Sequence, residues 1–286
     1  MSVQITTAFV EQYKNNVIHL AQQKGSRLRD AVRTEIVTGK DHFFERIGST
    51  AAQKRASRHS DTPRMDTPHS RRKVSLDDYD WADLIDQEDK VRLLISPQSE
   101  YAMAGAWAMG RAMDDAIISA ATGTAYSGVA GGTSVSLPSG QKVAHASGGL
   151  TLAKLLSAKE ILDAADVDPD EPRFLVCAAG QIADLLNVSQ VTSADYNTVR
   201  ALAAGQIDTY LGFKFIQSER LGTDSTPSRQ CLAFTKSAIG LAVGADVTTK
   251  ISERADKNYA TQVFLSMTIG ATRIEEEKMV EIAANE

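Results

Sequence analysis

The chain has 286 residues, of which 43% are hydrophobic and 23% are charged, and its formal net charge is −5. This length is typical of one large domain or two ordinary ones. The negative balance argues against a protein whose main task is to coat nucleic acid, because that task usually needs a strongly basic domain. No stretch of about 18 apolar residues is free of charge, so no membrane-spanning segment is expected.

The first part of the chain combines one helix pattern with two strand patterns. Apolar residues recur at helical spacing over 7–24 and predict an amphipathic helix that ends at Gly25. Residues 33–47 and 72–85 alternate apolar with polar or charged side chains, which predicts extended strands. The N-terminus lacks the pattern of a secretory signal peptide.

A basic stretch separates these two strands. Residues 49–75 hold seven Lys or Arg and two Asp, and residues 76–89 then hold seven acids and no base. A nucleic-acid arm, a disordered linker and a clasp for another subunit are all consistent with the basic stretch alone. A structureless loop of this length is uncommon inside a compact domain, whereas a long hairpin that pairs with another molecule meets that objection. A basic tip on one copy could then meet the acidic stem of the next, in a head-to-tail contact.

The clearest helix pattern covers 96–123. Pro97 stands near its start, Gly123 can end it, and good helix formers fill it. Asp114 and Asp115 are expected on its more exposed side, within reach of other charges on the same helix.

The rest of the chain alternates between helix and strand patterns. Residues 124–149 are rich in Gly, Ser and Thr and predict a hairpin closed near the "PSG" at 138–140. An α/β unit follows, with helices expected at 152–165, 180–187 and 193–205 and strands at 173–179 and 210–218. The tail from 260 is β again, with Gly270 as the site of a bulge. One face of this tail is apolar at period two, through Val263, Leu265, Met267, Ile269 and Ala271.

Motifs that carry chemistry are missing from the sequence. It contains no nucleotide-binding loop, zinc-protease signature or serine-hydrolase elbow. The "DVDPDEP" at 166–172 spaces carboxylates like a calcium loop, but Glu171 stands where that loop needs Gly, so we interpret it as a solvated turn. The five histidines show no ligand spacing. Cys177 and Cys231 lie in apolar contexts and are expected to be buried free thiols. We therefore predict no catalytic, cofactor-binding or metal-binding residues.

Several stretches, in this order, resemble one known family. They are "DDYDWADLIDQEDKVRLL", "GRAMDDAIISAATG", "PRFLVCAAGQIADLLN", "TSADYNTVRALAAGQIDTYLGFKFIQSERL" and "ATQVFLSMTIGATRIEEEKMVEI". These sequences resemble those of major capsid proteins of tailed bacteriophages with the Hong Kong 97-type fold. The resemblance extends from about Thr34 onward. The resemblance implies an α+β fold with these parts: an N-terminal arm at 1–32, an extended β-hairpin loop at 33–80, a peripheral domain at 81–149 with a spine helix at 98–122, an axial α/β domain at 150–240, and a return to the peripheral β-sheet at 241–286.

The resemblance also implies a function and partners. Copies of the chain would assemble through pentamers and hexamers into the icosahedral head around double-stranded DNA, held non-specifically, in virions assembled in the host cytoplasm. Many relatives begin with a long cleavable scaffolding segment. Too few residues precede the loop here, so a separate scaffolding protein is expected. A portal protein and a decoration protein are further expected partners.

The resemblance also implies that the basic stretch is the tip of the extended loop. We expect contacts between subunits from Arg58, Arg64, Arg71, Arg72 and Lys73 on one side and Asp77, Asp78 and Asp83 on the other. Tyr13 and Val17 of the N-terminal helix are expected to lie on a neighbour. Some relatives cross-link their subunits through a Lys–Asn isopeptide bond. No cross-linking motif is matched here by Lys40, Lys54, Lys73 and Asn258.

Three alternatives remain at this point. The same fold builds encapsulin-like nanocompartments, which hold an enzyme instead of DNA. An α/β enzyme at 150–240 would need a pocket with converging polar groups. A nucleic-acid-binding arm at 50–73 would bind DNA with a strong salt dependence.

Overall fold

The computed structural model describes residues 22–55, 57–58, 61–62, 64–86, 98–145, 148–187, 209–224 and 228–285, whose strands form three sheets. Tyr13, Val17 and the helix expected at 193–205 lie outside these residues. Residues 22–24, the end of the helix expected at 7–24, are not helical. In the described part of the chain, no helix combines the length and hydropathy that crossing a membrane requires.

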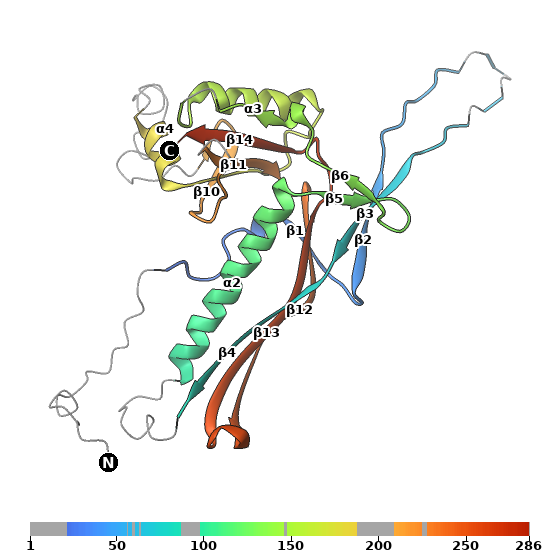
Figure 1. Ribbon diagram of the computed structural model, residues 1–286. Helices are drawn as coiled ribbons and strands as arrows, with labels where there is room; N and C mark the ends of the chain where they lie inside the picture. The colour runs from blue at the N-terminus through green and yellow to red at the C-terminus, as the bar shows by residue number, and fades with distance from the viewer. Residues whose placement is uncertain are drawn as a thin grey trace.

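A long four-stranded sheet carries helix α2 (Gln98–Thr122) along one face (Figure 1). Its strands, in spatial order, are β1 (Arg33–Ile36), β12 (Ile239–Arg254), β13 (Ala260–Arg273) and β4 (Asp77–Ile85). The apolar face predicted for β13 is confirmed, since Val263, Leu265, Met267 and Ile269 are buried in one cluster with α2. The helix approaches closely because Gly105 has no side chain: a Cβ there would lie 2.6 Å from the Trp81 ring.

The bulge expected at Gly270 is on the neighbouring strand. The register of β12 against β13 shifts between Val243 and Ala245 and again before Thr248, whereas Gly270 pairs in register with Ala242. The glycine serves another purpose, because a Cβ at position 270 would lie 2.2 Å from the Ser75 carbonyl oxygen. A 3₁₀ turn at Ala255–Lys257 closes the β12–β13 hairpin.

A six-stranded sheet carries helices on one face and packs its other face against the core of the four-stranded sheet. Its strands, in spatial order, are β7 (Lys142–Val143), β14 (Met279–Asn285), β11 (Ser228–Thr235), β8 (Arg173–Cys177), β10 (Phe213–Gln217) and β9 (Thr209–Tyr210). Helices α3 (Leu152–Ala164) and α4 (Ala179–Leu186) cover one face, and the other face joins the apolar cluster of α2. Strand β8 is buried on both faces, which explains why its sequence is apolar without alternation.

Residues 241–286 were expected to return to the peripheral β-sheet, but their strands divide between two sheets. Strands β12 and β13 lie in the four-stranded sheet, but β14 is inserted between β7 and β11 of the six-stranded sheet. Its side chains are buried almost throughout, so the last strand belongs structurally with the residues expected to form the axial unit.

A third sheet forms the base of a projecting hairpin. Its strands are β2 (Asp41–Ile47), β3 (His69–Ser75), β5 (Ala125–Ser127) and β6 (Thr133–Val135). The hairpin expected near "PSG" is wrong: β5 pairs with β6, while residues 139–141 form a 3₁₀ turn that leads into β7. The physical reason is that β14 presents a free edge, which β7 occupies. A short 3₁₀ helix, Arg29–Ala31, precedes β1.

Candidate functional site: the projecting hairpin, its anchor and the acidic edge strand

The most prominent surface feature is the loop at 48–68, which extends far from the body of the chain (Figure 1). A hydrogen bond from the Gly48 amide to the Pro68 carbonyl oxygen, 2.8 Å long, closes its base. Every described residue between them is exposed. Within the described residues, Lys54, Arg58 and Arg64 have no ion-pair partner. The loop therefore buries nothing in a single chain and presents unpaired cations.

The basic residues at the base of the hairpin behave differently from those of the loop. Arg71 pairs with Glu45 across β2 and β3 at 3.0 Å, and its guanidinium lies 5.4 Å from the Phe43 ring centre. Lys73 pairs with Asp41 at 3.1 Å. Both cations are thus held along the hairpin by their own chain.

Arg72 corrects the sequence prediction. We expected it to contact another subunit, but its side chain is only 3% exposed. Alternation along β3 turns it to the opposite face from Arg71 and Lys73, where Nε donates to the Ile274 carbonyl oxygen at 3.2 Å and Nη2 to Glu276 at 2.5 Å. Arg72 is therefore an internal anchor of the hairpin.

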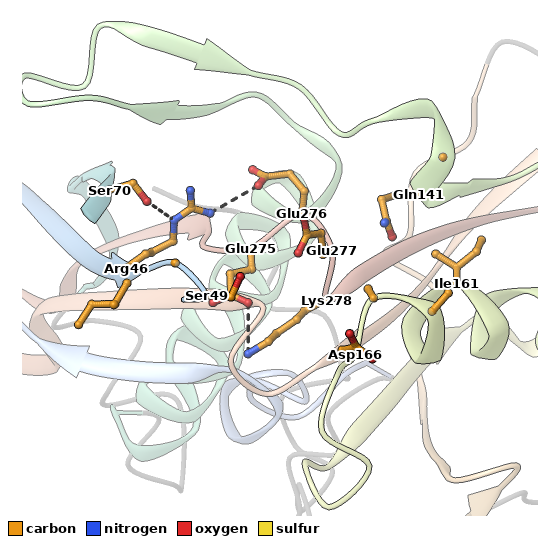
Figure 2. Close-up of a pocket in the computed structure, with 15 residues that line it drawn as sticks. Arg46, Ser49, Ser70, Gln141, Ile161, Asp166, Glu275, Glu276, Glu277 and Lys278 are labelled. Atoms are coloured by element: carbon orange, nitrogen blue, oxygen red, sulfur yellow. Dashed lines mark hydrogen bonds and ion pairs between the residues drawn. The ribbon is translucent and has the colours of Figure 1, made fainter. Parts of the chain in front are cut away.

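Glu276 is the centre of this anchor. Besides Arg72, its carboxylate lies 3.6 Å from Arg46 Nη1 and 3.7 Å from Arg273 Nε. Figure 2 shows Arg46 reaching from β2 between Ser70 and Glu276, at the rim of a groove of about 990 Å³. Burial lowers the pKa of the Arg273 guanidinium, and the charge of Glu276 acts in the opposite direction. A carboxylate shared by three guanidiniums fixes the direction in which the hairpin leaves the body.

The predicted acidic partners lie on the edge strand β4 but do not share one face. Tyr79 and Trp81 pack towards α2, so alternation places Asp77 and Asp83 on that side and Asp78 on the other. Asp78 accepts a hydrogen bond from Thr268 at 2.6 Å, and Asp83 accepts one from the Leu84 amide at 2.8 Å. The three carboxylates therefore do not form one continuous surface, and their contact with another subunit stays a prediction. Charges on an edge strand also discourage uncontrolled strand pairing.

A second anchor ties the chain start to α2. Asp114, expected on the exposed side of the helix, is fully buried. Its carboxylate accepts hydrogen bonds from Gln23, from the Ser26 hydroxyl at 2.5 Å, and from the Arg27 and Leu28 amides at 3.0 and 3.1 Å. The sequence could not show that Asp114 binds the segment at 22–28, because the two are distant along the chain.

Residue clusters that could carry chemistry are missing from the described part of the chain. No group of three or more His, Cys, Asp or Glu there could hold a metal ion. Cys177 and Cys231 are buried free thiols, as predicted. Burial raises the pKa of Cys177 to about 12 and that of Cys231 further, so neither sulfur is an activated nucleophile.

Comparisons with known proteins give a consistent result. The model of the family described as "Phage capsid protein" matches residues 5–286, whereas curated protein sequences gave no significant match. The capsid of cyanophage P-SCSP1u is 19% identical, with a TM-score of 0.73 over 97% of this chain and 94% of that chain. The capsid of an empty GTA particle is 14% identical, with a TM-score of 0.68 over 96% and 95%. A chain of Mycobacterium phage Che8 is 18% identical, with a TM-score of 0.63 over 94% and 97%.

These structural matches span nearly the whole chain, and they confirm the Hong Kong 97-type α+β fold. Because the family model also covers almost every residue, the chain belongs to the phage capsid protein family.

Proposed function

We propose that many copies of this chain assemble, as pentamers and hexamers, into the icosahedral head that encloses the double-stranded DNA of a tailed phage. The projecting loop is the observation that carries this proposal. A loop that is exposed at every described residue has no support from its own chain, and a neighbour would supply the burial that it lacks. Membership of the capsid family supports the same conclusion.

The loop would act as a clasp between neighbours. Arg58 and Arg64 of one copy would meet the exposed carboxylate Asp77 of the next. Asp78, on the other face of β4, is a weaker candidate because it already accepts a hydrogen bond from Thr268. Each exposed ion pair contributes only about 0–1 kcal/mol, so the clasp depends on its repetition around a closed ring. A contact between two different patches of identical subunits generates such rings. Arg71, Lys73 and Asp83 are weaker candidates, since each already has a partner in its own chain.

The N-terminal arm is the second proposed contact. Residues 22–28 are fixed to α2 through Asp114, so an arm at 1–32 would leave the body from a defined point and place Tyr13 and Val17 on a neighbour. We assign 33–80 to the extended loop, 81–149 to the peripheral domain and 150–240, together with β14, to the axial domain. A separate scaffolding protein, a portal protein and a decoration protein are proposed partners of the assembled head.

The test is assembly of the purified chain with and without its loop tip. The wild-type chain, expressed with the proteins encoded beside it, is examined by negative-stain electron microscopy and by nuclease protection. We expect uniform shells that protect long double-stranded DNA. A variant with residues 49–67 replaced by a short Gly-Ser turn should keep its circular dichroism spectrum and form no shells.

Two outcomes would change the conclusion. Shells that contain an enzyme and no DNA would indicate a nanocompartment. A wild-type chain that stays monomeric under every condition in which its partners are present would contradict the proposal.

A further inference from the structure

A crevice opens at the edge of the four-stranded sheet, between β4 and the C-terminal half of α2. It has a volume of about 430 Å³, and its lining comes from the end of β3, the start of β4, the last turns of α2 and the C-terminal end of β13. This crevice is separate from the groove at the hairpin base shown in Figure 2.

Small and acidic side chains line the walls of the crevice. Gly270 and Ala271 of β13 and Ala116 and Ala120 of α2 are among the small residues that line it. No lysine or arginine lines it. The crevice therefore has carboxylates in its lining and lacks a cation of its own.

Asp77 supplies the uncompensated charge of the wall. Arg220 holds the nearby Asp115 in a two-pronged ion pair, whereas Asp77 has no ion-pair partner among the described residues. Burial, and then the charges of Asp77 and Asp115, raise the pKa of Tyr79, which agrees with a negative potential inside the crevice. A carboxylate beside an aromatic ring is a pair that a guanidinium satisfies, by two hydrogen bonds and by stacking.

We propose that the crevice receives the guanidinium of Arg58 from a second copy of this chain. Arg58 lies at the middle of the loop at 48–68, is exposed and has no ion-pair partner in the described part of its own chain. Ten extended residues on each side give the loop a reach of about 33 Å. The loop extends away from the body in Figure 1, so it can reach beyond its own chain. This inference rests on the proposed function and names the place where the clasp closes.

Cysteine cross-linking in assembled particles tests the contact directly. The double variant Arg58→Cys with Asp77→Cys is assembled and then treated with a short bismaleimide, because an ion pair made by a long arginine side chain holds the two Cα atoms further apart than a disulfide can bridge. Each maleimide double bond adds one thiol, so no oxidant is needed and no group is released. The native thiols are both buried, so only the engineered pair reacts. The matched control is Arg58→Cys with Asp80→Cys, because Asp80 is exposed on the opposite face of β4.

The expected result is a ladder of covalent multimers for the 58/77 pair and at least about a tenfold weaker ladder for the 58/80 pair. Equal ladders, or particles without any 58/77 link, would overturn the inference while leaving the proposed function intact. Wild-type chain that forms no particles would instead contradict the proposed function.

A charge exchange covers the case in which the cysteine variants do not assemble. Arg58→Asp and Asp77→Arg should each lower particle yield about tenfold, and the double variant should restore it, since the attraction is rebuilt in reverse. A double variant no better than either single variant would count against the contact. Both positions are exposed, so folding of the single chain is preserved in these variants.

Discussion

The guanidinium of Arg273, on β13, lies against the last turn of α2, where Nη1 donates a hydrogen bond to the Ala121 carbonyl oxygen at 2.8 Å. The same nitrogen donates to Gly123 at 2.8 Å, and Nη2 donates to Val135 at 2.9 Å. The last carbonyl groups of a helix have no partner inside it. One buried side chain therefore ends α2 and fastens the start and the end of the β5–β6 hairpin to β13.

Replacing Arg273 by Met should be strongly destabilising. The substitution leaves three carbonyl oxygens without their donor and removes one cation from Glu276, so the free energy of unfolding should fall by about 3–5 kcal/mol. Urea denaturation of the unassembled chain measures this loss. The matched control is Arg254→Met, because Arg254 is exposed and pairs with nearby Asp256 and Gln262, and it should cost far less. Similar losses for both variants would contradict the anchoring role.

Glu276→Gln should loosen the projecting hairpin. A neutral amide cannot compensate the nearby guanidiniums of Arg46, Arg72 and Arg273, so we expect a loss of about 2–4 kcal/mol and faster hydrogen exchange in β2 and β3. The neighbouring exposed Glu277→Gln is the control and should leave both quantities unchanged. Unchanged exchange in the Glu276 variant would show that the hairpin direction is fixed elsewhere.

Gly110→Ala tests the close approach of the chain start to α2. A Cβ at position 110 would lie 2.4 Å from the carbonyl carbon of Gly25, so the segment at 22–28 must move. The clash should outweigh the gain in helix propensity of about 1 kcal/mol and give a net loss of about 1–3 kcal/mol. Gly180→Ala in α4 is the control: nothing lies within 4 Å of its Cβ position, so it should be neutral or stabilising by about 0.4–1 kcal/mol. Two variants of equal stability would argue against tight contact at Gly110.

The ion pair between Arg29 and Asp246 should give a small stability term that depends on pH. Arg29 holds the Asp246 carboxylate through two hydrogen bonds, of 3.1 and 2.6 Å, and these bonds lower the pKa of Asp246. A lowered carboxyl pKa stabilises the fold above the ordinary value of about 3.9, and the contribution disappears as the pH falls through the lower folded-state value.

Asp246→Asn should therefore cost about 0.2–1 kcal/mol at neutral pH, since the pair is partly exposed. The difference from the wild-type chain should vanish at a pH below both pKa values. Denaturation curves across this range provide the measurement, and a difference that persists in acid would mean that packing rather than charge is responsible.

Elements with strong local patterns could be predicted from the sequence. Helix α2 has a helix former at most positions and a glycine just past its end, and β13 alternates with a strict period of two, so both were found with bounds within a few residues. Strand β12 was not predicted, because its exposed half is polar on both faces and shows no alternation. The final strand was predicted as a strand, but its place in the six-stranded sheet depends on a partner at β11, which no local pattern reveals.

The candidate site could be predicted only in outline. Clustered charges around 49–89 indicated a basic loop followed by an acidic strand, and the described residues form an exposed loop at 48–68 and the strand β4. Sequence could not show that Arg72 and Asp114 are buried, since each is satisfied by residues distant in the chain. For Arg72 one signal was available: a strand that alternates must turn the middle residue of "RRK" away from its two neighbours.

The order of the strands has a consequence for synthesis. Strand β1 pairs with β12, through Arg33 and Gly240, and β14 supplies an interior strand of the six-stranded sheet. Neither sheet can close before β12 and β14 have left the ribosome, because contacts so distant in sequence form late. A nascent chain that lacks these strands thus has no finished surface to offer to other copies. Shell growth draws on subunits in which both sheets are complete.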